Sequence, residues 1–563
     1  MSSARTVSDA TFGVDVLRSA TPVLVWFSSE RCRPCRDMAP ALDEITKDLE
    51  GKIKVVKIDA NRELIIKSDY EVRGLPTMIM FKNGRPVARR VGALMSKERI
   101  EEWVHASLAS ALATQTRATF PRASEFTLSN GMAVVVIPVR RVPIVTHMVW
   151  YKVGAADVPR GAAGMALFLE HLMFKSTDRT AVGEFPKTIS RLGGQSNAFS
   201  GWDVTAYYER LSKDQLETAM KMEASRMARL RLTDEEVAVE RRVVMEVRRS
   251  LDSNPLRQLS EQMNAALFHM HPYGTPVIGS ANEMVKLSRK SAMSFFRRHY
   301  APNNAVLVVA GDVTPDEVER LAEKTYGKIA ANRAVHRRTR PQRSVHDIAR
   351  RVTLKDAGVG APILRRTYAV PSYVTARPGE AEALDLLASI LVGGSASRLH
   401  RRLVAQARLA SSVCGSYTGL AVDTGVISLS AVARSSDLRA IEDGIDAVLH
   451  EIRENGVTHT EFSRAKKSLI AKYIYDSENQ ERLANRYGLA VAVGRTIEDI
   501  ESWPDAISSV GVEDIRRVAE EHLDIRRSVT GWLLPEDDIE AAVQESNLVE
   551  LRQSSGQRRR PII

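Results

Sequence analysis

Strand-like and helix-like patterns alternate along residues 8–112, and this alternation is the strongest constraint that the sequence places on the fold. The apolar run at residues 23–27 predicts a buried strand, a helical stretch follows from Cys32, and residues 54–59 predict a second strand. Strands separated by helices predict an α/β domain with parallel strands. Cys32 and Cys35 form a Cys-x-x-Cys pair where the helix begins, a placement typical of a redox site.

This segment resembles thioredoxin along nearly its whole length. The resemblance rests on the Cys-Arg-Pro-Cys sequence, on the Gly-Leu-Pro-Thr element at residues 74–77 and on the Lys-Asn-Gly turn at residues 82–84. It implies that Cys32 lies at a helix N-terminus, where the helix dipole and free amides favour the thiolate. It also implies that Cys35 resolves the mixed disulfide and that Pro76 lies beside the sulfurs, at the edge where a peptide docks.

Two positions depart from the thioredoxin pattern. Arg31 replaces the tryptophan that usually precedes the first cysteine, and Trp26 replaces the usual buried acid. Because Arg31, Arg33 and Arg36 surround Cys32 with positive charge, we expect a thiolate that attacks readily. The lost acid removes a proton acceptor for the second thiol, so we expect a slower resolving step. The alternative is a thioredoxin fold kept as a docking module.

The chain of 563 residues is too long for one hydrophobic core, since single cores rarely exceed about 250–300 residues. A series of short motifs follows the first domain, in this order: a hairpin signal at 125–136, a helical stretch at 164–175, and segments at 192–198, 252–255, 271–274, 300–304, 306–312 and 391–399. This order resembles the insulinase/pitrilysin family over residues 120–540. That family includes bacterial zinc peptidases and mitochondrial processing peptidase.

The combined fold class is therefore an α/β thioredoxin fold followed by two α+β pitrilysin-type halves that form a clamshell. The resemblance implies that each half is a sheet covered by helices and that the halves face one another around a chamber. We divide the chain into a thioredoxin-like domain (1–112), a linker (113–122), an N-terminal half (123–332), a basic linker (333–351), a C-terminal half (352–540) and a tail (541–563).

The helical stretch at 164–175 resembles the His-x-x-Glu-His zinc helix of the family, but leucine takes the first place. In the family both histidines bind zinc and the glutamate between them activates water. The matching residues are Leu167, Glu170 and His171, so one ligand is lost while the base and the other ligand remain. The third family ligand lies seven residues after the glutamate that matches Glu240, and Val247 holds that position.

A catalytic zinc normally needs three protein ligands and an open position for water. We therefore expect zinc catalysis to be lost and no cofactor to be bound, with Glu170 and His171 left as a residual pseudo-zinc site. A site rebuilt from His171, Glu240 and Glu246 stays open as an alternative.

Two further parts of the family's site can be located. The arginine and tyrosine that hold the substrate carbonyl align with Val404 and Ser411, and Arg402 or Arg408 is the open alternative. Residues 195–200 resemble the strand whose exposed edge pairs with substrate, with Asn197 and Ala198 as the candidate contacts. Backbone pairing needs no zinc, so we expect either peptide binding there or a purely structural role.

Charge and cysteine content limit the partners. The net charge is +11, and residues 333–351 are densely basic. Since no nucleic-acid motif accompanies this stretch, we expect a solvated linker and no nucleic-acid partner. No apolar run approaches the roughly 18 residues that span a bilayer. Three cysteines and no apolar signal segment favour a reducing compartment, and we expect the cytoplasm.

Three functions remain. We favour a non-catalytic family member that binds peptides or pairs, as a heterodimer, with an active zinc-peptidase homologue, its thioredoxin domain providing a redox-controlled contact. The second is a thiol–disulfide oxidoreductase whose C-terminal region selects protein thiol or disulfide clients. The third is an active zinc metalloendopeptidase with an unconventional ligand set.

Overall fold

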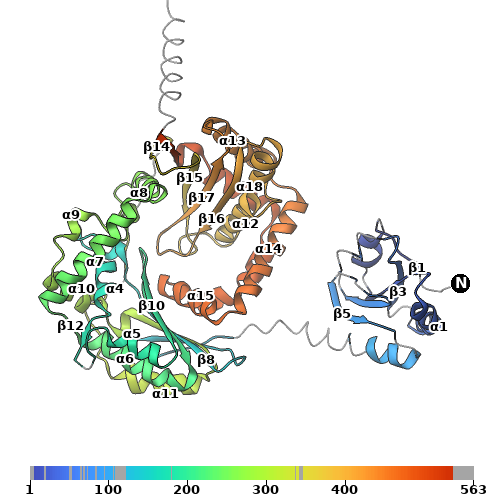
Figure 1. Cartoon of the computed structure of the whole chain (residues 1–563), viewed down its shortest axis with the longest axis horizontal. Helices are drawn as coiled ribbons and strands as arrows, with labels where there is room; N and C mark the ends of the chain where they lie inside the picture. Colours follow the sequence, from blue (N-terminus) through green and yellow to red (C-terminus); the bar gives the residue numbers. More distant parts are fainter. Residues whose placement is uncertain are drawn as a thin grey trace, which may run out of the picture. The chain divides into compact units, whose positions relative to one another are not determined.

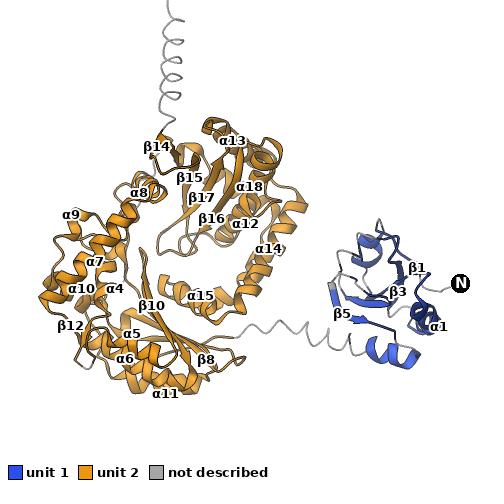
Figure 2. Cartoon of the chain, in the orientation of Figure 1, with its two compact units in different colours: residues 1–120 blue, residues 121–563 orange. Residues whose placement is uncertain are grey.

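The computed structural model forms two compact units, residues 1–120 and 121–563 (Figure 2). It describes residues 5–107 except 10, 18, 20, 50–52, 64–65, 68–69, 71, 73, 83–84, 94–95 and 105–106, and residues 122–536 except 179, 337 and 342–346. The predicted tail at 541–563 and nearly all of the predicted linker at 113–122 lie outside these residues. None of the helices described is both long and apolar enough to cross a bilayer.

The first unit has a thioredoxin-like sheet in the order β1-β3-β2-β4-β5. Strands β1, β3 and β2 run parallel, whereas β4 and β5 add as antiparallel neighbours. The elements are β1 (Arg5–Thr6), η1 (Gly13–Leu17), β2 (Val23–Ser28), α1 (Arg33–Asp48), β3 (Lys54–Asp59), β4 (Thr77–Lys82) and β5 (Arg85–Val91). The predicted α/β domain is confirmed, and Asn83 and Gly84 of the predicted turn lie outside the described residues.

The first half of the second unit contains a six-stranded sheet in the order β10-β11-β8-β13-β7-β6. Its strands are β6 (Ser124–Thr127), β7 (Ala133–Pro138), β8 (Ile144–Tyr151), β10 (Gln195–Ser200), β11 (Thr205–Ser212) and β13 (Ala305–Gly311), and β9 (Ser176–Thr177) pairs with β12 (Leu230–Arg231). Its α-helices are α4 (Met165–Leu172), α5 (Glu184–Arg191), α6 (Leu216–Arg229), α7 (Asp234–Asp252), α8 (Pro255–Phe268), α9 (Ala281–Met284), α10 (Arg289–His299) and α11 (Pro315–Thr325). Short helical turns are η2 (Ala155–Asp157), η3 (Lys213–Gln215), η4 (Pro272–Gly274), η5 (Pro302–Asn304) and η6 (Tyr326–Lys328).

The second half repeats this plan with a five-stranded sheet in the order β14-β18-β15-β17-β16. Its strands are β14 (Arg350–Lys355), β15 (Ile363–Pro371), β16 (Ala410–Thr418), β17 (Thr424–Ala433) and β18 (Ser528–Leu534). Its helices are α12 (Glu380–Val392), η7 (His400–Gln406), α13 (Leu438–Asn455), α14 (His459–Ser477), α15 (Gln480–Val493), α16 (Ile497–Glu501), α17 (Trp503–Ser509), α18 (Val512–His522) and η8 (Ile525–Arg527). The two predicted α+β halves are confirmed (Figure 1).

One helix of each half packs against the sheet of the other half. Successive residues of β7 point to opposite faces of the first sheet, as strand geometry requires. Val134 and Val136 join the core under α4 and α6, whereas Val135 and Ile137 join a core that contains Tyr487 and other residues of α15. In return, α8 packs on β18, β14 and β15 of the second sheet (Figure 1).

Glycine makes both exchanged contacts close. A Cβ atom added to Gly488 of α15 would lie 2.0 Å from Nε1 of Trp150 on β8. A Cβ atom added to Gly531 of β18 would lie 2.3 Å from the sulfur of Met263 on α8. At each of these two contacts the helix lies so close to the sheet that a side chain larger than that of glycine would not fit.

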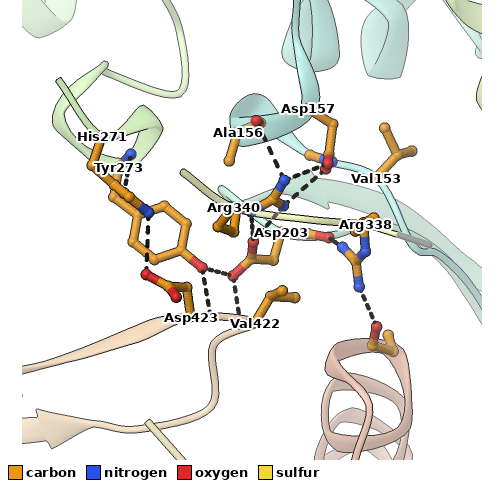
Figure 3. Close-up of polar contacts among 12 residues, drawn as sticks. Val153, Ala156, Asp157, Asp203, His271, Tyr273, Arg338, Arg340, Val422 and Asp423 are labelled. Atoms are coloured by element: carbon orange, nitrogen blue, oxygen red, sulfur yellow. Dashed lines mark hydrogen bonds and ion pairs between the residues drawn. The ribbon is translucent and has the colours of Figure 1, made fainter. Parts of the chain in front are cut away.

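Residues of the basic linker contact both halves of the second unit at the place where the halves meet (Figure 3). Arg340 is 4% exposed and pairs with Asp157 at 2.6 Å and with Asp203 at 2.7 Å. Tyr273 donates its hydroxyl hydrogen to Asp203, and Asp203 Oδ2 also accepts from the Val422 N–H of the second half at 3.0 Å. We expected a solvated linker, and this expectation is wrong for Arg340. Its side chain is buried because it pairs with two carboxylates of the first half.

Replacing Gly488 by alanine tests the helix exchange. In an exposed helix this change would stabilise the protein by about 1 kcal/mol. Here we expect a loss of about 1–3 kcal/mol in the free energy of unfolding, because the new methyl group overlaps Trp150. Chemical denaturation measures the loss. Gly360→Ala is the matched control, since a Cβ there meets nothing within 4 Å. A Gly488 variant as stable as the control would contradict the packing.

Candidate functional site

The residual pseudo-zinc site is built on α4 and α7, two helices that pack together at the edge of the first core. Gly164 precedes α4 with φ of 90°, and a Cβ atom there would lie 2.4 Å from the carbonyl oxygen of Ile278. Only glycine adopts this conformation readily at such a close approach. Phe168 and Leu172 then anchor the helix in the core.

His171 faces a carboxylate of α7. Its Nδ1 atom lies 2.9 Å from Oε1 of Glu240, and the Lys175 ammonium pairs with Oε2 of the same residue. Burial acts to raise the pKa of Glu240, but the hydrogen bonds from His171 and Lys175 outweigh it and hold that pKa below its usual range. Glu240 is thus an ionised carboxylate with both oxygens engaged.

Glu170 precedes His171 on α4 and faces the edge strand β10. It is 8% exposed, and Ser200 of β10 donates its hydroxyl hydrogen to Oε2 at 2.6 Å. Burial raises the pKa of Glu170, although Ser200 and His171 act in the opposite direction. Glu170, which matches the base of the family, is therefore a buried carboxyl next to the edge strand β10.

The donor set at this site does not fit zinc. Leu167 packs against the first core, and Val247 is 37% exposed with no polar atom to offer. Glu246 points to solvent and pairs with Arg249, so the rebuilt set of His171, Glu240 and Glu246 is not assembled. One free imidazole nitrogen falls two ligands short of a catalytic zinc site.

In the part of the chain that the structure describes, one group of three metal-ligating side chains comes together elsewhere. It consists of Glu380, Glu521 and His522 in the second half. The guanidinium of Arg377 pairs with both carboxylates of this group. A guanidinium of the chain therefore already occupies the place of a cation between the two carboxylates.

Strand β10 forms the edge of the first sheet and has no partner on its outer side among the described strands. Gly201 N–H donates to the Val204 carbonyl at 2.8 Å, so in the alternating pattern of an antiparallel pair the amides of residues 196, 198 and 200 point outward. The Ala198 N–H is occupied by Oδ1 of Asn197 at 2.8 Å. Asn197 and Ala198, the two predicted contact residues, thus lie at the free edge of the sheet. The side chain of Asn197 occupies the main-chain N–H of Ala198.

The cysteine pair lies where the sequence predicted it, at the start of α1. Cys32 and Cys35 form a disulfide, and Cys32 is the N-cap residue whose sulfur accepts from the Cys35 N–H at 3.2 Å. Cys32 is partly exposed, whereas Cys35 is buried. A cis peptide bond precedes Pro76, and Leu75 packs against the same core cluster as both cysteines.

Trp26 fills the position of the missing acid. Its ring belongs to the same core cluster as Cys35, and the Lys57 ammonium lies 5.2 Å from the ring centroid. Arg36 donates to the Glu30 carbonyl at 2.6 Å, and Arg33 is exposed beside Asp37. The arginines predicted around Cys32 thus extend to solvent and to the main chain.

The second-half positions offer no carbonyl clamp. Val404 packs against the second core, and the Ser411 hydroxyl donates to the Val432 carbonyl at 3.2 Å. Two residues of the first half were missed by the sequence analysis: Ser200, which bonds the base, and Lys175, which neutralises Glu240. The spacing of Lys175, one helical turn after His171, is a signal that could have revealed it.

Comparisons with known proteins agree with this architecture. Residues 3–106 match the family model described as thioredoxin, residues 134–281 the insulinase model (peptidase family M16) and residues 286–469 the peptidase M16 inactive domain. Over 421 residues the chain is 28% identical to the zinc protease PqqE of Helicobacter pylori, covering 74% of this chain and 93% of that protein. It is 31% identical over 409 residues to an uncharacterized zinc protease of Mycobacterium leprae, covering 71% and 89%.

Solved structures show the same fold. The crystal structure of a protease from Helicobacter pylori matches with a TM-score of 0.68 and 28% identity, over 74% of this chain and all of that chain. A peptidase M16 inactive domain from Pseudomonas fluorescens matches with a TM-score of 0.67 and 18% identity, over 73% and 98%.

Replacing Glu170 by glutamine tests the electrostatics of the residual site. The ordinary pKa of this carboxyl is 4.5 and the folded pKa is higher, so the folded wild type loses stability as the pH rises from about 4.5 through the folded pKa. We therefore expect the free energy of unfolding of the variant, relative to wild type, to increase over that window. Each unit of raised pKa is worth about 1.4 kcal/mol. Denaturation at several pH values measures it.

Glu246→Gln is the matched control, because it makes the same change on an exposed side chain. The difference in stability between the two variants at each pH isolates the contribution of the buried carboxyl. A Glu170 variant that behaves like this control would show that burial does not perturb the carboxyl.

Proposed function

The chain belongs to the insulinase family of peptidases, peptidase family M16, and we propose that it is a member that binds extended peptides without zinc or pairs with a zinc-bearing homologue. The observation that carries this proposal is the metal-ligand set. Leu167 and Val247 hold two ligand positions, and the carboxylate beside the third, Glu240, is neutralised by Lys175. A charge that a metal would supply in an active enzyme is supplied here by an ammonium group of the chain itself.

The free edge of β10 supports peptide binding. Outward-pointing N–H and C=O groups can pair with an added strand, and this pairing needs no metal. The Asn197 side chain covers the Ala198 N–H in the free protein, so an incoming peptide would have to displace it. Capping of this kind protects an edge strand from unspecific pairing, which fits an edge used by selected partners.

A second candidate function is thiol–disulfide exchange with protein clients. It is favoured by the arrangement of the disulfide, since a partly exposed Cys32 at a helix N-terminus and a buried Cys35 are suited to attack and resolution. In this function the peptide-binding half presents a client and Pro76 shapes its docking edge. The proposed compartment is a reducing one, the cytoplasm.

Metal content and peptide binding test the first proposal together. We expect near-zero zinc per chain by elemental analysis of protein purified without chelators or a metal-binding tag. We expect fluorescence anisotropy to detect binding of labelled, reduced and carboxymethylated α-lactalbumin, an unfolded polypeptide probe. Ala198→Pro removes the outward N–H and should weaken this binding at least about fivefold, since an edge position tolerates proline but loses one hydrogen bond.

Ala198→Ser keeps the N–H and is the matched control, so it should bind as wild type does. One zinc per chain that disappears on His171→Ala, together with cleavage of the probe that a chelator stops, would instead establish the active peptidase with an unconventional ligand set. A chain with neither zinc nor affinity for the probe or for an active homologue would contradict the proposal.

Replacing Cys32 by serine tests the redox candidate. We expect wild-type protein to reduce the disulfides of insulin in the presence of dithiothreitol, and we expect the variant to lose this activity because the attacking thiolate is gone. Cys414→Ser is the control, because it removes the exposed cysteine outside the pair. Equal rates in wild type and the Cys32 variant would show that the pair is not a redox site.

A further inference from the structure

A cavity in the second unit, here called the basic cavity, lies between the first half and the basic linker. Its volume is about 650 Å³, and it is lined by seven residues between 152 and 165, by residues of α10 and η5, and by residues 334–336 and 338–340. Its lining contains the lysine and arginine residues Lys152, Arg298, Arg338 and Arg340 and the histidines His299 and His336. Asp157 is the acidic residue of this lining.

The positive charge of the basic cavity is not balanced by its own acid. Asp157 is already paired with Arg340 at 2.6 Å, and Arg340 shares a second carboxylate, Asp203 (Figure 3). The side chains of Lys152 and Arg298 form no ion pair with any residue in the described ranges.

Arg338 adds a further charge to the cavity without a carboxylate partner. Its guanidinium donates to the main-chain carbonyl of Asp203 and to that of Ala492, the latter at 2.6 Å (Figure 3). Main-chain carbonyls hold a guanidinium in place but leave its net charge intact. Lys152, Arg298 and Arg338 therefore line one space, and none of the three is ion-paired with a carboxylate of the described residues.

Burial and the neighbouring positive charges lower the pKa values of several groups in the lining. Burial lowers the pKa of Lys152 and Arg338 lowers it further, whereas Glu125 acts to raise it. Burial also lowers the pKa of His299; Asp157 opposes this effect, and Arg298 and Arg338 add to it. Burial likewise lowers the pKa of Arg338, which Asp157 and Asp203 oppose. A bound anion would relieve this repulsion and favour the charged forms.

We propose that the basic cavity binds a small molecule that carries a phosphate group. Several cations around one space favour a multivalent anion over a single carboxylate, and guanidinium groups donate two parallel hydrogen bonds to phosphate oxygens. Phe295 and Met165 line the same cavity, so an apolar portion of the ligand has a surface to contact. The lining includes no residue of β10 and neither cysteine of the pair, and the proposal does not depend on either proposed function.

Isothermal titration of the full-length protein with pyrophosphate tests the site, in a buffer without other oxyanions and at constant ionic strength. We expect saturable binding at one site per chain. Lys152→Gln and Arg298→Gln should each weaken it about tenfold or more, since each removes a charged hydrogen-bond donor. Arg298 is exposed at the mouth of the cavity, so its variant is expected to fold even if Lys152→Gln does not.

Arg297→Gln is the matched control, because Arg297 is the neighbouring residue on α10, is exposed and lies outside the lining of the cavity. It should bind pyrophosphate as wild type does. Titrations with inorganic phosphate and with adenosine triphosphate distinguish a free phosphate from a nucleotide as the occupant. Citrate binding without pyrophosphate binding would overturn the proposal in favour of a carboxylate ligand. No binding of pyrophosphate, or equal binding by all three variants, would also overturn it.

Discussion

The exchange of helices between the two halves is the interaction on which the rest of the second unit depends. Each sheet has one face covered by its own helices and the other face covered by a helix of the opposite half, α15 on the first sheet and α8 on the second. Neither half could bury both faces of its sheet alone, since apolar strand residues such as Val135 and Ile137 would be left in water. The halves therefore fold as one compact unit, and the edge strand β10 is held at a fixed place within it.

The basic linker adds a polar layer to this apolar exchange. Arg340 ties together two loops of the first half, while Asp203 also accepts a hydrogen bond from the second half. A buried ion pair contributes little net stability compared with apolar packing, but removal of one partner leaves a charge buried and unpaired. The cluster thus specifies how the linker crosses the junction, where Arg338 lines the basic cavity.

In the residual pseudo-zinc site, the side chains at the positions that match the family's zinc ligands contact other groups of the chain. The helix that presents His171 and Glu170 is anchored by Phe168 and Leu172, which are buried in the first core. Lys175 neutralises Glu240, and apolar Leu167 and Val247 fill the other positions. Local folding and catalytic chemistry are therefore separable in this fold: core packing maintains the helix, whereas the ligand set alone decides whether zinc can bind.

The sequence by itself determined the order of the domains, most of the strands that carry the candidate sites and the positions that no longer offer metal ligands. These features depend on local periodicity, on turn residues and on residue identity, which can be read along the chain. Tertiary structure alone decided that Lys175 would share Glu240 with His171, that Asn197 would cap the free edge of β10 and that the side chain of Arg340 would be buried. Each of these outcomes depends on which side chains from distant segments, or from the free side of a sheet, come within hydrogen-bonding distance. Spacing places Lys175 one turn after His171, but it does not show which distant carboxylate the two residues meet, because tertiary packing sets that.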